Sequence, residues 1–149
     1  MKNKQKGFTL IELMVTIAVL AIIAMLAAPS MTSMRYNQDL KRQDRNISLT
    51  LNDARSNAKA LNKPMNVYFS TPNPSSDPSN TFYVDIDATK FDFNKTGQKF
   101  LFKSNGVLDL PAGKSSVCFE LKHKKSGNFK SIKLNRFGMQ ELKDSACGG

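Results

Sequence analysis

The chain has 149 residues, of which 40% are hydrophobic and 23% charged, enough for one folded domain with its own core. This composition excludes a disordered or collagen-like chain. The 22 lysine and arginine residues exceed the 12 aspartate and glutamate residues, and the net charge of +10 favours an acidic partner without specifying which one. Two cysteines and one histidine make a zinc site or a histidine-based triad difficult to build.

The first 28 residues differ sharply from the rest of the chain. Residues 1–7 are polar and carry three lysines, which by the positive-inside rule hold them in the cytoplasm. Residues 8–28 contain one charged residue, Glu12. As a helix they would measure about 31 Å, close to the ~30 Å hydrocarbon core of a bilayer. A carboxylate in such a segment costs about 2–3 kcal/mol near the centre and less near the end, so another interaction must offset it.

Two ordinary interpretations fit this segment only in part. A secretory signal peptide shares the basic start and the apolar run. The run is longer than a usual hydrophobic region, however, and a cut after Ala28 would place Leu26 at the −3 position and Pro29 directly after the cut. A plain membrane anchor explains the length of the run but not Glu12.

The segment KGFTLIEL, which contains Gly7 and Glu12, resembles the class III signal peptide of type IV pilins and type II secretion pseudopilins. A glycine, a hydrophobic residue and a glutamate at a fixed offset open one apolar helix, which makes the motif specific. The resemblance implies that a prepilin peptidase cuts between Gly7 and Phe8 and that the new Phe8 amine is methylated. It also implies that the Glu12 carboxylate meets the positive Phe8 amine of a neighbouring subunit, which sets the register of assembly.

Beyond Pro29 the sequence continues a helical pattern. Pilin-family helices often carry a proline at this place, and Pro29 would remove one backbone hydrogen bond and bend the helix; a helix end at Ala28 is the alternative. Apolar residues then recur at helical spacing on one face: Leu40, Ile47, Leu51, Ala54, Ala58 and Leu61. We expect the helix to run on to about Leu61, where Asn62-Lys63-Pro64 stops it.

After Pro64 the period of the apolar residues changes to two, which is typical of half-buried strands in antiparallel sheets. The alternating residues are Met65, Val67 and Phe69; Phe82, Val84 and Ile86; Phe100 and Phe102; Val117, Phe119 and Leu121; and Ile132 and Leu134. Turn residues separate these runs at Gly97, Asn105-Gly106, Gly113, Ser126-Gly127 and Gly138. One long helix followed by strands predicts an α+β fold class, with the helix packed on antiparallel sheet.

This order predicts a leader peptide (1–7), a transmembrane and assembly helix (8–28), its amphipathic continuation (29–61) and a periplasmic β-rich domain (62–149). It resembles the GspH/FimT branch of the pilin family, which includes FimU-like minor pilins, and residues 132–140 are similar to the closing strand–turn–strand of that branch. The resemblance implies the pilin fold, no cofactor, a single pass through the inner membrane and a place at the pilus tip. The implied partners are other minor pilins, the major pilin and the prepilin peptidase.

Cys118 and Cys147 are the only cysteines. Cys118 falls in a strand pattern, and Cys147 lies two residues from the C-terminus. If the domain lies outside the inner membrane, its surroundings are oxidising. A disulfide would then tie the tail to the sheet and stabilise the domain by about 3.5 kcal/mol. Two free thiols are the alternative.

Five lysines gather around one predicted hairpin: Lys122, Lys124, Lys125, Lys130 and Lys133. Without the leader, 19 basic residues remain against 12 acidic residues, a net charge of +7. Such a patch can neutralise phosphates, and some FimT-type minor pilins capture DNA with a basic, arginine-containing motif in their C-terminal region. Residues 136–144 of this chain hold one arginine and two acids, which favours a solvated face or a protein contact over DNA.

Residues that could carry catalysis or bind metal are sparse. His123 lies in a lysine-rich turn, and we expect it on the surface. Asp85, Asp87 and Asp92 lack the glycine and final glutamate of a calcium loop, so we expect no metal site. No nucleophile-elbow, P-loop or dinucleotide motif is present, and we expect no enzyme. The sequence favours a minor pilin over two rivals, a type II secretion minor pseudopilin and a DNA-binding pilin for natural transformation.

Overall fold

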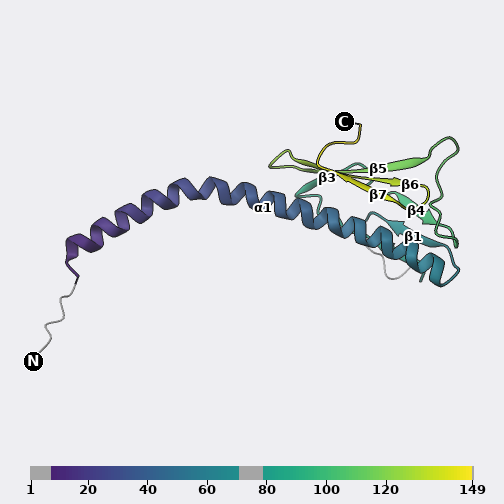
Figure 1. Ribbon diagram of the computed structural model, residues 1–149, viewed down its shortest axis with the longest axis horizontal. Helices are drawn as coiled ribbons and strands as arrows, with labels where there is room; N and C mark the ends of the chain where they lie inside the picture. The colour runs from purple at the N-terminus through teal and green to yellow at the C-terminus, as the bar shows by residue number, and fades with distance from the viewer. Residues whose placement is uncertain (1–7, 71–78, 149) are drawn as a thin grey trace, which may run out of the picture. The chain divides into compact units, whose positions relative to one another are not determined.

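The computed structural model describes residues 8–70 and 79–148, apart from the side chains of residues 27–30 (Figure 1). The chain divides into two units, Met1–Arg35 and Tyr36–Gly149. One helix, α1 (Leu10–Ala60), contributes to both, so the predicted continuation of the helix beyond Pro29 is confirmed. Pro29 lies among the residues whose side chains are not described, and the bend there stays a prediction.

In the second unit, α1 is amphipathic, and its apolar stripe packs against the strands to form the helical side of the core. The stripe residues Leu40, Ile47, Leu51, Ala54 and Ala58 are at most 2% exposed, as their spacing predicts. The helix ends at Ala60. Its last turn is closed where Asn62 adopts a φ of 49° and the Lys63 N–H donates to the Ala58 carbonyl, a pattern typical of helix C-termini. Leu61 was expected in the stripe but lies past this end and is exposed.

The first sheet has the strand order β2-β1-β4, formed by β2 (Thr81–Tyr83), β1 (Met65–Tyr68) and β4 (Lys99–Phe102). Strand β1 pairs antiparallel with β4, as expected, but parallel with β2. The period of two gives the burial of a strand but not its direction. A parallel neighbour needs a connection of about a dozen residues, and the proline-rich stretch between β1 and β2 supplies that length. Val84 and Ile86, expected to extend β2, lie beyond its end.

The second sheet is antiparallel throughout its described strands and has the order β3-β5-β6-β7. It comprises β3 (Phe91–Phe93), β5 (Ser116–His123), β6 (Phe129–Asn135) and β7 (Gln140–Lys143). The short β3 was not predicted, although Phe91 and Phe93 carry the same alternation. In Figure 1 the labelled strands lie along one side of the second half of α1, so the predicted packing of the helix on antiparallel sheet is confirmed.

A cluster of aromatic rings fills the core between the sheets and the helix. The Phe69 ring lies 5.1 Å from Phe119 and 4.9 Å from Phe93 between centroids, and Phe100 lies 5.0 Å from Phe119. Such offset and edge-on pairs add to the free energy gained by burying the rings. Phe69 directly follows β1, and the other three rings belong to β3, β4 and β5. The cluster therefore joins the two sheets into one domain.

Two turn glycines make room for basic side chains of the helix. Gly138 has a φ of 80°, and a Cβ atom there would lie 2.4 Å from the Cδ of Arg55. Gly106 has a φ of 75°, and a Cβ atom there would lie 2.3 Å from the Cε of Lys59. Arg55 and Lys59 are one helical turn apart, so glycine at both turns lets the loops close over this end of α1.

Candidate functional site

The start of α1 carries the predicted assembly residue, Glu12. Its carboxylate accepts a hydrogen bond from the Thr9 backbone N–H at 3.0 Å and another from the Thr9 hydroxyl at 3.0 Å. The Glu12 N–H donates in turn to the Thr9 hydroxyl at 3.3 Å. This reciprocal arrangement is a capping box. Sequence reasoning missed this role, although Thr9-x-x-Glu12 is its signature.

The helix that follows Glu12 exposes apolar side chains on all sides of the first unit. Phe8 is 89% exposed, and the large apolar residues from Leu10 to Leu26 are 50–77% exposed. Such a surface requires lipid or other apolar helices around it. By length and hydropathy no single described helix qualifies as a membrane span, and the segments Leu10–Leu26 and Met31–Ala60 qualify only when they are taken together.

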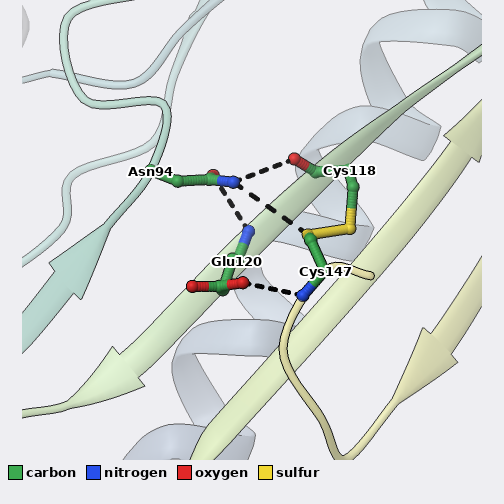
Figure 2. Close-up of a disulfide and its surroundings, with 4 residues drawn as sticks. All are labelled: Asn94, Cys118, Glu120 and Cys147. Carbon is green, nitrogen blue, oxygen red and sulfur yellow. Dashed lines mark hydrogen bonds between the residues drawn. A yellow bond between two sulfur atoms is a disulfide. The ribbon is translucent and has the colours of Figure 1, made fainter. Parts of the chain in front are cut away.

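The second predicted site, the disulfide, is present and anchors the C-terminal tail to β5. Cys118 and Cys147 are bonded, with their Cα atoms 6.0 Å apart. Figure 2 shows Asn94 reaching toward this bond from the segment after β3. The Asn94 amide donates to the Cys118 carbonyl at 3.1 Å and accepts from the Glu120 N–H at 2.9 Å. The Glu120 carboxylate accepts from the Cys147 N–H at 2.7 Å, so the tail is held by one covalent bond and a small polar network.

The five lysines proposed for nucleic-acid contact do not form one continuous free patch. Three of them have partners within the domain. Lys124 pairs with Asp92 at 3.4 Å and donates to the Ala88 carbonyl at 2.6 Å. Lys122 lies over the Phe129 ring at 5.2 Å, and Lys130 pairs with Asp144.

The register of β5 and β6 also separates these lysines. Lys130 is paired with the buried Leu121, so its side chain lies on the helix-facing side and is 17% exposed. Lys133 is paired with Cys118, on the opposite face, because paired residues of an antiparallel ladder point the same way. The sequence places these lysines close together along the chain, but the strand alternation divides them between two faces.

Beneath Lys130 lies a buried carboxylate, Asp44, although charged residues of an amphipathic helix are expected on its polar face. Asp44 is 5% exposed. Burial raises its pKa to about 6; the charge of Lys130 acts in the opposite direction, and the charge of Asp144 raises the pKa further. The hydrogen bond and charge of Lys130 instead lower the pKa of Asp144. The tail, β6 and α1 therefore meet at one group of charges.

The prediction that His123 is a surface residue is wrong. His123 is 2% exposed, 4.7 Å from the Tyr36 ring and 5.4 Å from Phe91 between centroids. It continues the inward alternation of Phe119 and Leu121 along β5, which was the available signal. Its Nδ1 accepts the Ser126 N–H at 3.2 Å, so it shapes the β5–β6 turn.

The three aspartates considered for metal binding do not come together. Asp87 caps a local turn by accepting bonds from the N–H and hydroxyl of Thr89, which lower its pKa. Asp92 pairs with Lys124 instead. Within residues 8–70 and 79–148, no group of three acidic, histidine or cysteine side chains is arranged to hold a metal ion.

Comparison with known proteins places a recognised motif at the N-terminus. The family described as the prokaryotic N-terminal methylation motif matches residues 2–28. No solved structure matches the chain. The motif is a type IV pilin-like prepilin signal, and on a helix-and-sheet domain it supports a type IV pilin-like protein. It fits a pilin or pseudopilin of a type IV pilus or a type II secretion system, processed by a prepilin peptidase and assembled with other pilins.

Proposed function

We propose that this chain is a minor pilin of the type IV pilus, a non-enzymatic subunit that joins a minor-pilin complex priming assembly at the pilus tip. The observation that carries the proposal is the methylation motif on residues 2–28, followed by a helix whose apolar side chains are exposed on all sides. Cleavage falls between Gly7 and Phe8, and Phe8 becomes the methylated first residue. Gly7 lies outside the described residues.

Glu12 has two separable tasks in this proposal. Within one chain it completes the capping box with Thr9. In the filament its charge meets the Phe8 amine of a neighbouring subunit. Removing one partner of a buried ion pair costs about 3–5 kcal/mol, because the other charge is left unpaired. A glutamine at position 12 keeps a side chain suited to the capping box but removes the charge.

The test compares Glu12→Gln and Glu12→Leu with the unchanged full-length chain in a deletion strain. Both variants insert in the membrane and are cleaved, but both enter sheared pili at least about tenfold less than the unchanged chain, since both lack the charge. N-terminal mass spectrometry, immunoblots of sheared pili and twitching motility are the measurements. Normal incorporation of Glu12→Gln would restrict Glu12 to capping and remove the ion-pair role.

The same strain tests the proposal against its rivals. Loss of pili and twitching on deletion supports the priming role. Loss of type II secretion with normal pili would assign the chain to that system as a minor pseudopilin. Normal pili with lost transformation would assign it to DNA capture, which the division of the five lysines between two faces does not favour.

A further inference from the structure

Strand β7 forms an unpaired edge of the second sheet. The order β3-β5-β6-β7 places β7 at the end, and no described strand pairs with its outer side. Unpaired edges offer backbone N–H and C=O groups to another chain unless the protein covers or disrupts them. Adding a strand to such an edge is a common mode of protein recognition.

The turn before β7 decides which backbone groups face outward. The Asn135 N–H donates to the Met139 carbonyl at 3.0 Å, and the Met139 N–H donates to the side-chain Oδ1 of Asn135 at 2.9 Å, so the backbone groups of Met139 face Asn135 of β6 as in a hydrogen-bonded pair. Hydrogen-bonded pairs alternate along an antiparallel ladder. Residues Glu141 and Lys143 therefore bond to β6, whereas Gln140 and Leu142 direct their backbone groups away from the sheet.

Apolar side chains accompany these outward groups. Phe137 is 63% exposed, Met139 is 64% exposed and Leu142 is 55% exposed. Single exposed apolar residues are ordinary on a protein surface. Here the register puts Leu142 on the helix-facing side with its partner Ile132, whereas Met139 shares the opposite side with Glu141. A strand added to this edge would therefore meet an apolar side chain on each of its two faces. We call Phe137, Met139, Gln140 and Leu142 the β7 edge.

Positive charge near Phe137, at one end of the β7 edge, indicates the sign of the charge on its partner. A hollow of about 350 Å³ beside Phe137 is also lined by Lys114 and Arg136. The whole chain carries +10, or +7 without its leader. A second copy would bring the same charge to this edge, whereas an acidic chain complements it.

The direction of β7 constrains the partner further. Asp44 of α1 is close enough to Asp144 for their charges to interact, and the Ser48 carbonyl accepts from the Gln140 amide at 3.0 Å. From residue 44 to residue 48 of α1, the partners on the other side go from 144 back to 140. Helix α1 and strand β7 therefore run antiparallel. A strand added antiparallel to β7 then runs parallel to α1. Two copies joined antiparallel through β7 would instead point their α1 helices in opposite directions.

We propose that the β7 edge receives an extended strand of a different, acidic pilin-like subunit, which adds antiparallel to β7 and packs apolar side chains on Phe137, Met139 and Leu142. The inference rests on the proposed function, because a filament inserts all of its subunits in one membrane with the same orientation. It adds the contact surface and the chemistry of the partner.

Photo-cross-linking in the native host tests the proposal on the full-length chain. A photoreactive amino acid replaces Met139 on the edge or, as a control, exposed Lys125 on the β5–β6 turn. Position 139 is expected to capture a processed pilin-like subunit with an isoelectric point below 7, and position 125 is not. Leu142→Pro removes an outward N–H without touching the ladder to β6. It is expected to lower the cross-linking yield at position 139 at least about tenfold. The matched control, Leu142→Ala, lowers that yield less than about threefold.

Phe137→Glu provides a second variant that does not depend on a strained strand. It places a negative charge at an exposed turn position, and it lowers the cross-link to an acidic partner as well. Equal capture at positions 139 and 125, an unchanged yield with Leu142→Pro and Phe137→Glu, or capture of a second copy overturns the proposal. The N-terminal mass separates the two hypotheses: a chain still beginning at Met1 overturns the proposed function, while a processed chain without the cross-link overturns the β7 edge alone.

Discussion

The two units of the chain place their apolar side chains in opposite environments. In the first unit the large apolar residues from Leu10 to Leu26 are at least 50% exposed, whereas in the second the helix stripe is at most 2% exposed. One continuous helix therefore belongs to two environments. Stability comes from the second unit, because its core is complete within one chain, and assembly depends on the first, which gains burial only from lipid or other subunits.

The largest expected effect tests this division in the core. Phe119 is 1% exposed and packs against Phe69 and Phe100, so Phe119→Ala lowers the free energy of unfolding by about 3–5 kcal/mol. Leu20→Ala, a truncation of a side chain that is 63% exposed, changes it by less than about 0.5 kcal/mol. Urea unfolding of the full-length chain in detergent measures both. Equal losses from the two substitutions would contradict the division.

The disulfide gives the next largest effect and concerns the second unit alone. Cys118 and Cys147 close a loop with a sequence separation of 29, and Cys147→Ser is expected to lower the free energy of unfolding by about 3.5 kcal/mol. Cys118→Ser and the double variant should give nearly the same loss, since either substitution removes the same bond. Chemical unfolding and the mass of the unreduced protein are the measurements. Additive losses would indicate that each sulfur contributes by packing rather than through the bond.

Local periodicity explains how much of the fold was predictable. The helix stripe from Leu40 to Ala58, the helix stop at Asn62 and the inward positions of β5 follow from patterns of a few residues. The parallel pairing of β1 with β2 does not, because strand direction is set by contacts distant in sequence. The short β3 was missed although Phe91 and Phe93 alternate, since three residues give little pattern to detect.

The candidate sites show the same contrast: local sequence patterns predict some of them, and contacts distant in sequence decide the others. The disulfide was predictable from two cysteines in a domain expected to be extracytoplasmic, and the capping box of Thr9 with Glu12 could have been read from its spacing. The lysine group shows the opposite case. Proximity in sequence suggested one patch, but a strand turns alternate residues to opposite faces, and Lys130 meets Asp44 and Asp144 instead of solvent.

The smallest expected effect concerns Asp44, the charged residue within the buried helix stripe. Because burial raises its pKa to about 6 from 3.8, the folded state binds a proton more readily than the unfolded state. The protonated Asp44 makes its whole contribution to the free energy of unfolding below about pH 4, and this contribution is lost as the pH rises through about 6. Asp44→Asn is therefore expected to stabilise the chain at pH 7.5 by about 1–3 kcal/mol, with a gain that shrinks toward pH 4.

The sign of this result distinguishes burial from ion pairing. If the attraction to Lys130 outweighed desolvation, the ionised Asp44 would be favourable and its substitution would destabilise the fold at pH 7.5. Thermal unfolding of the full-length protein at pH 4.5, 6 and 7.5 decides between the two signs. Asp53→Asn, on the exposed face of the same helix, is the matched control and changes the free energy of unfolding by less than about 0.5 kcal/mol. A stabilisation confined to Asp44→Asn would show that the globular unit tolerates a charge in its core at a cost that apolar contacts around α1 offset.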